Sequence, residues 1–231
     1  MRTKNTLTLY VEGGNRDSRA ALLECQQAFK TFLERAGVPA RGFTVTACGD
    51  RRTAFEDFKF AVEQGENALL LVDSEAGVAT DTGTGQPVTP WQHLAGRNGD
   101  GWTPPVQATA VQVHLMVPTM EAWLVADKAS LAAYYTGKFG REAFNESALP
   151  RRDDVEQVSK EALYEALQNA TRPNRSKGPY HKGNHSFEIL KTLNPQVVAR
   201  GSYHFRRLLC HLKAALQAAS MAWLDCAEFT A

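Results

Sequence analysis

The stretch Ala68-Leu69-Leu70-Leu71-Val72-Asp73-Ser74-Glu75 is an unbroken apolar run that ends in two acids. A run of this length, followed directly by polar and glycine-containing sequence, is typical of a parallel strand that is buried on both faces. Open α/β folds place their ligands at the carboxyl ends of such strands. We therefore expect Asp73 and Glu75 at the rim of a parallel sheet, with both side chains on one side if the strand continues through them.

Two interpretations of this acid pair are open. Carboxylates held this close repel each other unless a cation lies between them, and hard divalent cations such as Mg²⁺ and Mn²⁺ prefer oxygen ligands. Asp73 and Glu75 would then form half of a metal site. Alternatively, they are a polar strand end that enters a solvated loop, which the Asp-x-Glu pattern alone favours. A second acid at an equivalent place earlier in the chain shifts the balance toward the metal site.

That second acid is Glu12. Thr6–Val11 alternates polar and apolar residues, which predicts a first strand, and it runs into Glu12-Gly13-Gly14-Asn15, where two glycines permit a tight turn. Phe43–Cys48 predicts a second strand, and the sequences between the strands have helical periodicity. A β-α-β-α-β order implies parallel strands joined by right-handed crossovers. Glu12 and Asp73 should therefore emerge at the same edge of the sheet.

A long segment, 76–110, follows the central strand and is rich in Gly, Pro, Thr and Asp. Loops of this length are usually lids or binding segments. Trp91 and Trp102 within it could stack on bases, but we favour a role in anchoring the segment to the body of the domain. Val111–Val117 then predicts a further strand. Glu121, in the first turn of the next helix, fits an additional metal ligand and an acid that complements the helix dipole equally well.

Helical periodicity recurs along the chain and dominates its second half. It covers 18–35, 53–63, 118–126, 129–135, 159–168, 186–193 and 203–225, with a short helix from 195. His204 and His211 are expected to be hydrogen-bonded helix residues rather than ligands.

The predicted fold class is α/β, with a mainly parallel sheet flanked by helices. We expect residues 1–127 to form an α/β core with the 76–110 insertion, and residues 128–231 to form a helical extension that packs on it.

A cationic tract, 172–185, carries two histidines and a tyrosine but no acid. Its Gly and Pro residues predict a loop rather than a helix. One interpretation is a segment whose Lys and Arg side chains contact the phosphates of a substrate, and the other is a solvated surface loop. The Tyr and His residues, together with the possible metal site, favour the first. The spacing of His181 and His185 suits a metal only in a helix, which Gly183 argues against.

The overall composition limits the kinds of molecule that the chain can be expected to bind. A formal net charge of +1, from 26 Lys and Arg against 25 Asp and Glu, excludes a uniformly basic surface, so we expect the isolated chain to bind nucleic acid weakly and in a salt-sensitive way. No apolar run reaches the length of a membrane span and no leader-like sequence precedes the first strand, so we expect a cytoplasmic protein without a membrane partner. Cysteines without short spacings are expected to be reduced thiols; they are Cys25, Cys48, Cys210 and Cys226.

The acids resemble the metal-binding motifs of the Toprim domain, which topoisomerases, bacterial primases and several nucleases share. Val11-Glu12-Gly13-Gly14 is similar to the first motif of that family, with Glu12 as its glutamate. Asp73-Ser74-Glu75 is similar to the second motif, with Glu75 where the family has a second aspartate. The resemblance covers the α/β core and implies a Toprim-like, Rossmann-like fold. Because Glu75 is longer than aspartate by a methylene, the motif leaves open whether one ion or two would bind.

A narrower resemblance rests on five stretches. They are Cys48-Gly49-Asp50-Arg51-Arg52, Leu71-Val72-Asp73-Ser74-Glu75, Trp91-Gln92-His93-Leu94, His114-Leu115-Met116-Val117 and Met120-Glu121-Ala122-Trp123. Together they look like a family of small Toprim-related proteins, which are commonly encoded beside an ATPase of the ABC or AAA type in presumed phage-defence loci. This resemblance implies a nucleic acid substrate and an ATPase partner.

The resemblance implies metal-assisted phosphoryl transfer. Asp73 and Glu75 would hold Mg²⁺ or Mn²⁺ at the attacked phosphate, with Glu121 as a candidate additional ligand. Glu12 would complete the metal shell or act as general base or acid.

A cation in the basic tract would neutralise the charge that develops on the phosphate. The candidates are Lys177, Lys182, Arg175 and His181. Lys182 is the first choice, because of its place between His181 and Gly183 and its likeness to a lysine that related nucleases keep near the metal.

Three functions are compatible with this pattern. The leading one is a metal-dependent nuclease that acts on DNA or RNA together with an ATPase partner. The second is a non-catalytic, Toprim-like binding subunit that holds a partner protein or nucleic acid with 76–110 and 172–185. The third is a nucleotidyl transferase on the same scaffold. The acidic set favours the nuclease over the binding subunit, because a decayed site has no need for three rim carboxylates.

Overall fold

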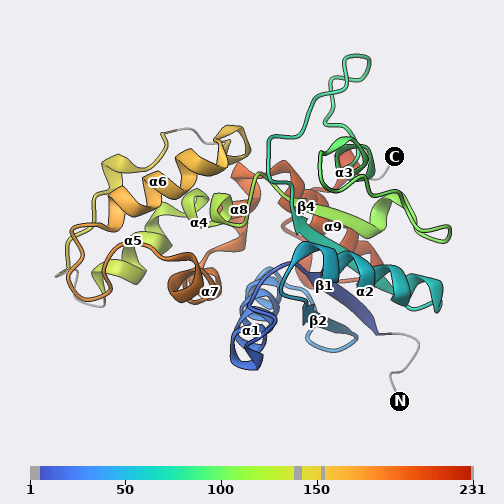
Figure 1. Ribbon diagram of the computed structural model, residues 1–231, viewed down its shortest axis with the longest axis horizontal. Helices are drawn as coiled ribbons and strands as arrows, with labels where there is room; N and C mark the ends of the chain where they lie inside the picture. The colour runs from blue at the N-terminus through green and yellow to red at the C-terminus, as the bar shows by residue number, and fades with distance from the viewer. Residues whose placement is uncertain (1–5, 138–141, 152–153, 230–231) are drawn as a thin grey trace.

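The computed structural model of the chain describes residues 6–137, 142–151 and 154–229 (Figure 1). Within these residues, four strands form one sheet in the order β2-β1-β3-β4; they are β1 (Leu7–Val11), β2 (Phe43–Ala47), β3 (Ala68–Asp73) and β4 (Val113–Met116). Every neighbouring pair is parallel, and Leu9 in β1 lies opposite Val45 on one side and Leu69 on the other. The predicted α/β class, with a parallel sheet flanked by helices, is confirmed.

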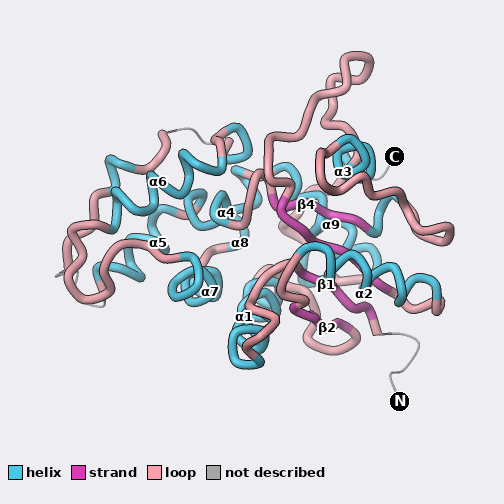
Figure 2. Tube along the Cα trace, viewed as in Figure 1, coloured by secondary structure: helices cyan, strands magenta, loops and turns pink. Residues whose placement is uncertain are grey.

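Helices surround the sheet and continue beside it (Figure 2). In chain order they are α1 (Arg19–Arg35), α2 (Arg51–Glu63), α3 (Pro90–Gly96), α4 (Glu121–Ala126), α5 (Lys128–Thr136), α6 (Lys160–Thr171), α7 (Lys182–Thr192), α8 (Pro195–Gly201) and α9 (Tyr203–Leu216), with short 3-10 helices between and after them. Side-chain oxygens of Ser18 and Asp50 accept hydrogen bonds from the first turns of α1 and α2, which satisfies free backbone N–H groups there. None of the described helices is long and apolar enough to cross a membrane.

Both faces of the sheet are covered, because successive side chains of a strand point to opposite faces. One face carries Leu71 and Val11 and packs against α1 and α9. The other carries Leu70 and Val72 and packs against α2 and α3. Burial on both faces explains why β3 is an unbroken apolar run rather than an alternating one.

The helices α4 to α8 form a group beside the sheet (Figure 1). α9 leaves this group and lies on the sheet itself, where Phe205 stacks on Phe32 of α1 with ring centroids 5.1 Å apart. The larger hydrophobic core runs without a break from the sheet through these helices. The two expected domains, 1–127 and 128–231, therefore share one continuous core.

Two helix boundaries differ most from the prediction. The prediction that 172–185 is a loop is wrong from Lys182 onward, because α7 begins there and includes Gly183. Buried side chains of α7, such as Leu190, pack into the core, and this packing outweighs the low helix propensity of one glycine. The prediction of a helix over 203–225 is wrong beyond Leu216, because Gln217 adopts a left-handed conformation, with φ of 49°, that ends α9.

Aromatic side chains hold the 76–110 segment to the domain, as predicted. Trp91 on α3 is buried, and its ring lies beside the rings of Phe55 and Phe58 on α2, with centroids 6.4 and 6.3 Å away. Trp102 stacks on Phe55 of α2 with ring centroids 4.4 Å apart. Both rings therefore anchor the segment.

Cys210 and Cys226 form a disulfide that joins α9 to the C-terminal segment. The expectation of reduced thiols is therefore wrong for this pair, whereas Cys25 and Cys48 are free and buried. The turn after α9 brings the Cα atoms of the bonded pair to 5.6 Å, within the usual range for a disulfide. The separation of 16 residues between the two cysteines does not by itself predict that the chain folds back to pair them.

A cluster of basic residues, His114, Arg207 and His211, lies between β4 and α9. The rings of His114 and His211 are 5.0 Å apart, and Arg207 Nη1 lies 3.2 Å from His114 Nδ1. Burial, together with the charge of Arg207, lowers the pKa of both histidines, to about 4 for His211. His204 is hydrogen-bonded as expected, since it lies 2.8 Å from Glu156, but His211 Nδ1 has no partner among the described atoms.

The neutral histidines predict a loss of stability in acid. An unfolded histidine takes up a proton near pH 6.5, whereas folded His211 has a pKa of about 4. The unfolded chain therefore binds more protons between these values. Stability that is complete above about pH 6.5 should fall as the pH drops toward 4, with a slope of up to about 1.4 kcal/mol per pH unit for each such histidine.

Urea unfolding at about pH 7.5 and about pH 5 measures this loss. We expect the loss to be smaller for His211→Gln than for wild type. It should be unchanged for His181→Gln, which replaces an exposed histidine. Equal losses in all three proteins would contradict a neutral His211 in the folded chain.

The turn after β1 brings the backbone close to α1 and α7. Gly13 has φ of 144°, and its N–H and carbonyl groups pair with those of Gly49 at 2.9 and 3.0 Å. A Cβ atom on Gly13 would lie 2.9 Å from the sulfur of Cys25 and 3.5 Å from the ring of Phe187. Only glycine fits this position without displacing its neighbours.

Gly13→Ala is expected to lower the free energy of unfolding by roughly 1–3 kcal/mol, because the added methyl group meets both a strained backbone and a packed neighbour. Gly77→Ala is the matched control, since a Cβ atom there meets open space, and its effect should be within about 0.5 kcal/mol. Urea unfolding measures both. Equal stability of the two variants would show that the turn relaxes at no cost.

Candidate functional site

Three carboxylates meet at the carboxyl edge of the sheet. Glu12 follows β1, Asp73 ends β3, and Glu75 lies two residues beyond, and one oxygen of each lies within 4.8 Å of the others. Because β1 and β3 are neighbouring parallel strands, their ends lie at the same edge. The prediction that Glu12 and Asp73 emerge together is confirmed.

Glu75 joins this group through a turn and not, as predicted, through continuation of the strand. β3 ends at Asp73, and Glu75 has φ of 67°, so the strand does not continue through the pair. The N–H groups of Ser74 and Glu75 donate to the carbonyls of Met116 and Pro118, both at 2.8 Å. A left-handed turn, rather than strand alternation, therefore brings the two carboxylates together.

Backbone groups fix the direction of the buried carboxylates. The N–H of Asp73 donates to Glu12 Oε2 at 3.1 Å, and the N–H of Met120 donates to Asp73 Oδ1 at 2.9 Å. His93 Nε2 donates to the carbonyl of Ser74 at 2.9 Å, which ties the 76–110 segment to the turn. The acids are thus oriented before any ligand arrives.

Two cations that are not among the predicted site residues, Arg51 and Lys160, form ion pairs with Glu75. Arg51 Nη1 lies 3.6 Å from Glu75 Oε1 and 3.9 Å from Glu12 Oε2, and its Nη2 donates to Asp100 Oδ2 at 2.6 Å. Lys160, at the start of α6, forms an ion pair with Glu75. Arg51 could have been suspected, since it follows a predicted strand end. Lys160 could not, because 85 residues separate it from Glu75.

Lys182 comes to the site, as predicted. Its Nζ lies 3.6 Å from Asp73 Oδ2 and 3.4 Å from Glu121 Oε2, while its side chain stays 53% exposed. Glu121 is buried in the first turn of α4 and accepts a hydrogen bond from Tyr180 at 3.0 Å. Glu121 therefore lies beside Lys182 instead of within the group of three carboxylates, and its role as a metal ligand stays a prediction.

Among the described residues, no ion pair or hydrogen bond joins the other three basic candidates to the three carboxylates of the site. Lys177 Nζ lies over the ring of Tyr134, 4.7 Å from its centroid. His181 is the exposed N-cap residue of α7, and Arg175 is exposed in the loop before it. Of the four predicted cations, the structure brings Lys182 to the carboxylates.

Burial and mutual repulsion make the ionised forms of Glu12 and Asp73 unfavourable unless a further positive charge is present. Burial raises the pKa of Asp73 well above its usual value, the charge of Glu12 raises it further, and Lys182 offsets only part of this. Burial likewise raises the pKa of Glu12. Burial alone would also raise the pKa of Glu75, but the ion pair with Lys160 outweighs it and the pKa is lowered.

The donor set fits a metal ion. Its donors are carboxylate oxygens, the ligands that hard cations prefer. The repulsion between Asp73 and Glu12 is the strain that a bound cation would relieve. Glu12, Asp73 and Glu75 could therefore hold a metal ion together.

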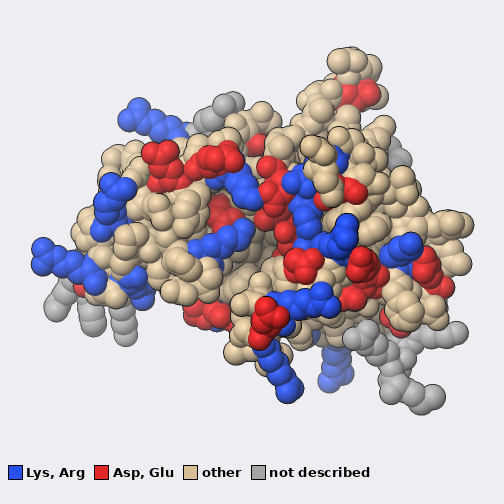
Figure 3. Space-filling model, in the orientation of Figure 1, with Lys and Arg blue, Asp and Glu red and all other residues tan. Residues whose placement is uncertain are grey.

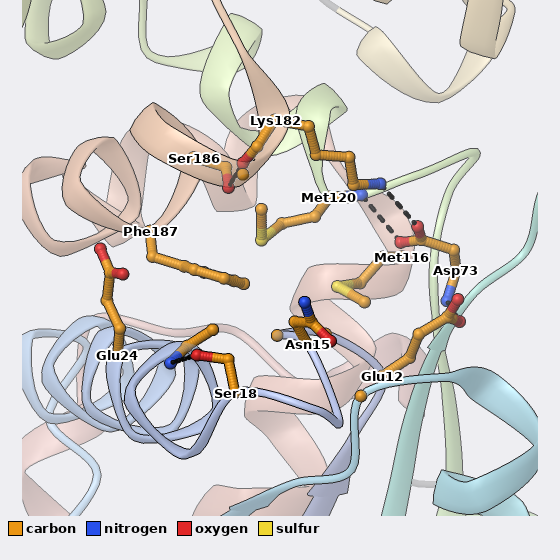
Figure 4. A pocket seen from close by; sticks show the side chains of 15 residues that line it. Glu12, Asn15, Ser18, Glu24, Asp73, Met116, Met120, Lys182, Ser186 and Phe187 are labelled. Carbon is orange, nitrogen blue, oxygen red and sulfur yellow. Dashed lines mark hydrogen bonds and ion pairs between the residues drawn. The ribbon is translucent and has the colours of Figure 1, made fainter.

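A pocket of about 390 Å³ opens beside the carboxylates (Figure 4). Glu12 and Asp73 lie at one end, Lys182 reaches over them from α7, and Glu24 and Phe187 lie at the other end. On the molecular surface, a hollow between the helical group and the sheet has acidic and basic side chains on its walls (Figure 3). A ligand in this pocket can touch the carboxylates and α7 at once.

A family model described as Domain of unknown function (DUF4276) matches residues 16–213. The chain belongs to the DUF4276 family. The matched part of this DUF4276 chain contains Asp73, Glu75 and Lys182, whereas Glu12 precedes it. No curated protein and no solved structure matches the chain significantly.

Metal titration tests the carboxylate group of the DUF4276 chain. We expect wild type to bind Mn²⁺ in isothermal titration calorimetry, and Asp73→Asn to bind it roughly 100-fold more weakly because a ligand is lost. Asp57→Asn replaces an exposed aspartate on α2 and is the matched control. It should bind Mn²⁺ like wild type.

Asp73→Asn should not lower the thermal stability of the metal-free protein. In EDTA, we expect the thermal midpoint of Asp73→Asn to equal or exceed that of wild type. The raised pKa of Asp73 means that its ionised form opposes folding at neutral pH, and asparagine removes that charge. Unchanged Mn²⁺ affinity would contradict a metal site built on Asp73, and a lower midpoint in EDTA would contradict an unfavourable charge on Asp73 in the metal-free fold.

Proposed function

We propose that this chain is a metal-dependent nuclease that hydrolyses phosphodiester bonds of DNA or RNA with Mg²⁺ or Mn²⁺. The observation that carries the proposal is the group of Glu12, Asp73 and Glu75, whose oxygens lie within 4.8 Å of one another. It occupies the edge of a parallel sheet where α/β folds bind ligands. All-oxygen donor sets of this kind suit Mg²⁺ and Mn²⁺, and the likeness to the Toprim motifs supports the same chemistry.

The roles of the site residues follow from their placement. Asp73, Glu75 and Glu12 would hold the metal ion, which when bound polarises a phosphate oxygen as a Lewis acid. The half-exposed side chain of Lys182 lines the pocket, with Nζ next to Asp73, so it can approach a phosphate there. A fixed cation in this place favours the charge that develops in the transition state. Glu12 is also available as a general base or acid.

Arg51 and Lys160 act as positioning residues. Both are engaged with Glu75, and Arg51 is also bound to Asp100 and to the carbonyl of Asp73 at 3.1 Å. These contacts hold the left-handed turn in which Glu75 faces Asp73. Neither side chain needs to touch the substrate.

An ATPase of the ABC or AAA type, and a role in phage defence in the cytoplasm, belong to the proposal through the narrower resemblance. The net charge of +1 supports dependence on a partner. A chain without an excess of positive charge has little general attraction for nucleic acid, so a second protein that delivers the substrate would raise its activity.

Cleavage assays on supercoiled plasmid and total RNA test the proposal. We expect cleavage by wild type with Mg²⁺ or Mn²⁺, and none in EDTA. Glu12→Gln and Asp73→Asn should lower the rate on the order of 100-fold or more, because each removes a ligand or a proton-transfer group. Glu56→Gln replaces an exposed glutamate on α2 and is the matched control. It should cleave like wild type.

The outcomes separate the candidate functions. Metal binding without cleavage, even beside the ATPase partner, would favour a non-catalytic binding subunit. Metal-dependent incorporation of labelled nucleotide would favour a nucleotidyl transferase. Cleavage that survives both substitutions would place the chemistry outside the three carboxylates.

A further inference from the structure

The pocket beside the carboxylates has an apolar part that cutting a phosphodiester does not require. Met116, Met120 and Phe187 form this part, and Glu12 and Asp73 lie next to it (Figure 4). A phosphate and a metal ion need charged and polar neighbours. The apolar part therefore suits the portion of the substrate that is attached to the phosphate.

We propose that this pocket takes one unstacked nucleobase of the substrate, a proposal that rests on the nuclease function proposed above. The chain then acts on single-stranded nucleic acid, or on a nucleotide that has turned out of a duplex. The pocket volume of about 390 Å³ is in the range of small-molecule sites. The bases of an intact duplex are stacked and paired, so they cannot enter it.

Phe187 provides the surface on which the base stacks. Its ring extends into the pocket toward Met120 (Figure 4). Aromatic rings stack on bases with little regard to sequence, and methionine adapts its shape to a flat ring. Phe187 and Lys182 belong to the same helix, α7. The group that faces the phosphate and the group that faces the base are therefore fixed relative to each other.

The turn after β1 leaves room for this arrangement. Gly13 lines the pocket, and a Cβ atom on it would come within 3.5 Å of the Phe187 ring. A side chain there would occupy the space between the turn and α7. Gly13 is therefore required for the turn and also leaves this side of the pocket open.

Glu24 gives the pocket a way to read the edge of the base. It lines the pocket on α1, and no hydrogen bond or ion pair to its carboxylate is seen among the described residues. A free carboxylate accepts hydrogen bonds from the exocyclic amines of adenine, cytosine and guanine. Uracil and thymine have no such amine, so they should bind more weakly.

Ligand binding in the presence of Mn²⁺ tests the base pocket without cleavage. Adenosine 5′-monophosphate and ribose 5-phosphate share a phosphate and a sugar, and only the first carries a base. We expect wild type to bind the nucleotide roughly 10-fold or more tightly than the sugar phosphate in calorimetry. Uridine 5′-monophosphate should fall between them, and Glu24→Ala, which removes the acceptor oxygens, should narrow the difference between the two nucleotides.

Phe187→Leu should lower the affinity for adenosine 5′-monophosphate to that for ribose 5-phosphate, and leave the latter unchanged. The affinity for ribose 5-phosphate therefore reports that the variant is folded and that its phosphate site is intact. Phe60→Leu is the matched control, since Phe60 is 65% exposed on α2. On oligonucleotides of one sequence, wild type should cleave the single strand roughly 10-fold or more faster than the duplex.

The outcomes distinguish the pocket from the function on which it rests. Equal affinity of wild type for the two phosphates, or equal cleavage of single strand and duplex, overturns the base pocket and leaves the metal-dependent nuclease standing. If neither phosphate binds, the base pocket is overturned as well, and the plasmid and RNA assays show whether the nuclease has failed with it.

Discussion

The repulsion between carboxylates at one edge of the sheet is the constraint around which this structure is arranged. Parallel pairing of β1 with β3 brings Glu12 to Asp73, and both are largely removed from water. Charges in such a place need partners of opposite sign. The cations around the edge and the backbone N–H groups that orient the acids stabilise these negative charges.

The counter-charges come from parts of the chain far from the strands that carry the acids. Arg51 begins α2, Lys160 begins α6 and Lys182 begins α7. Each side chain thus extends from the start of a helix toward the sheet edge, so the placement of three helices sets the electrostatics of the site. The helical second half of the chain is therefore part of the site, which agrees with the single core that it shares with the sheet.

Function and stability make opposite demands on these residues. A buried carboxylate with a raised pKa, such as Asp73, weakens the fold at neutral pH, and the fold persists because the apolar core around β3 is extensive. The turn at Gly13 is a second constraint, since its positive φ and close neighbours admit only glycine, and the missing side chain leaves open the space beside Phe187. Such local costs are common where a protein prepares a site for a ligand.

The sequence by itself determined the sheet, the covering of both its faces and the meeting of Glu12 with Asp73. These features depend on local patterns: apolar runs, helical periodicity and the parallel order that β-α-β-α-β imposes. Its likeness to Toprim motifs also points to Lys182, although the loop predicted around this residue is wrong from Lys182 onward, where α7 begins.

Only the tertiary structure decided how the site is completed. Packing brings Lys160 into an ion pair with Glu75, which lies 85 residues away in the sequence, and holds Glu75 in a left-handed conformation. It also places Glu121 beside Lys182 and brings Cys226 close enough to Cys210 for a disulfide. The physical reason is the same in each case. These contacts join residues from separate elements, and their geometry is set by how helices pack on the sheet, which no local pattern of residues encodes.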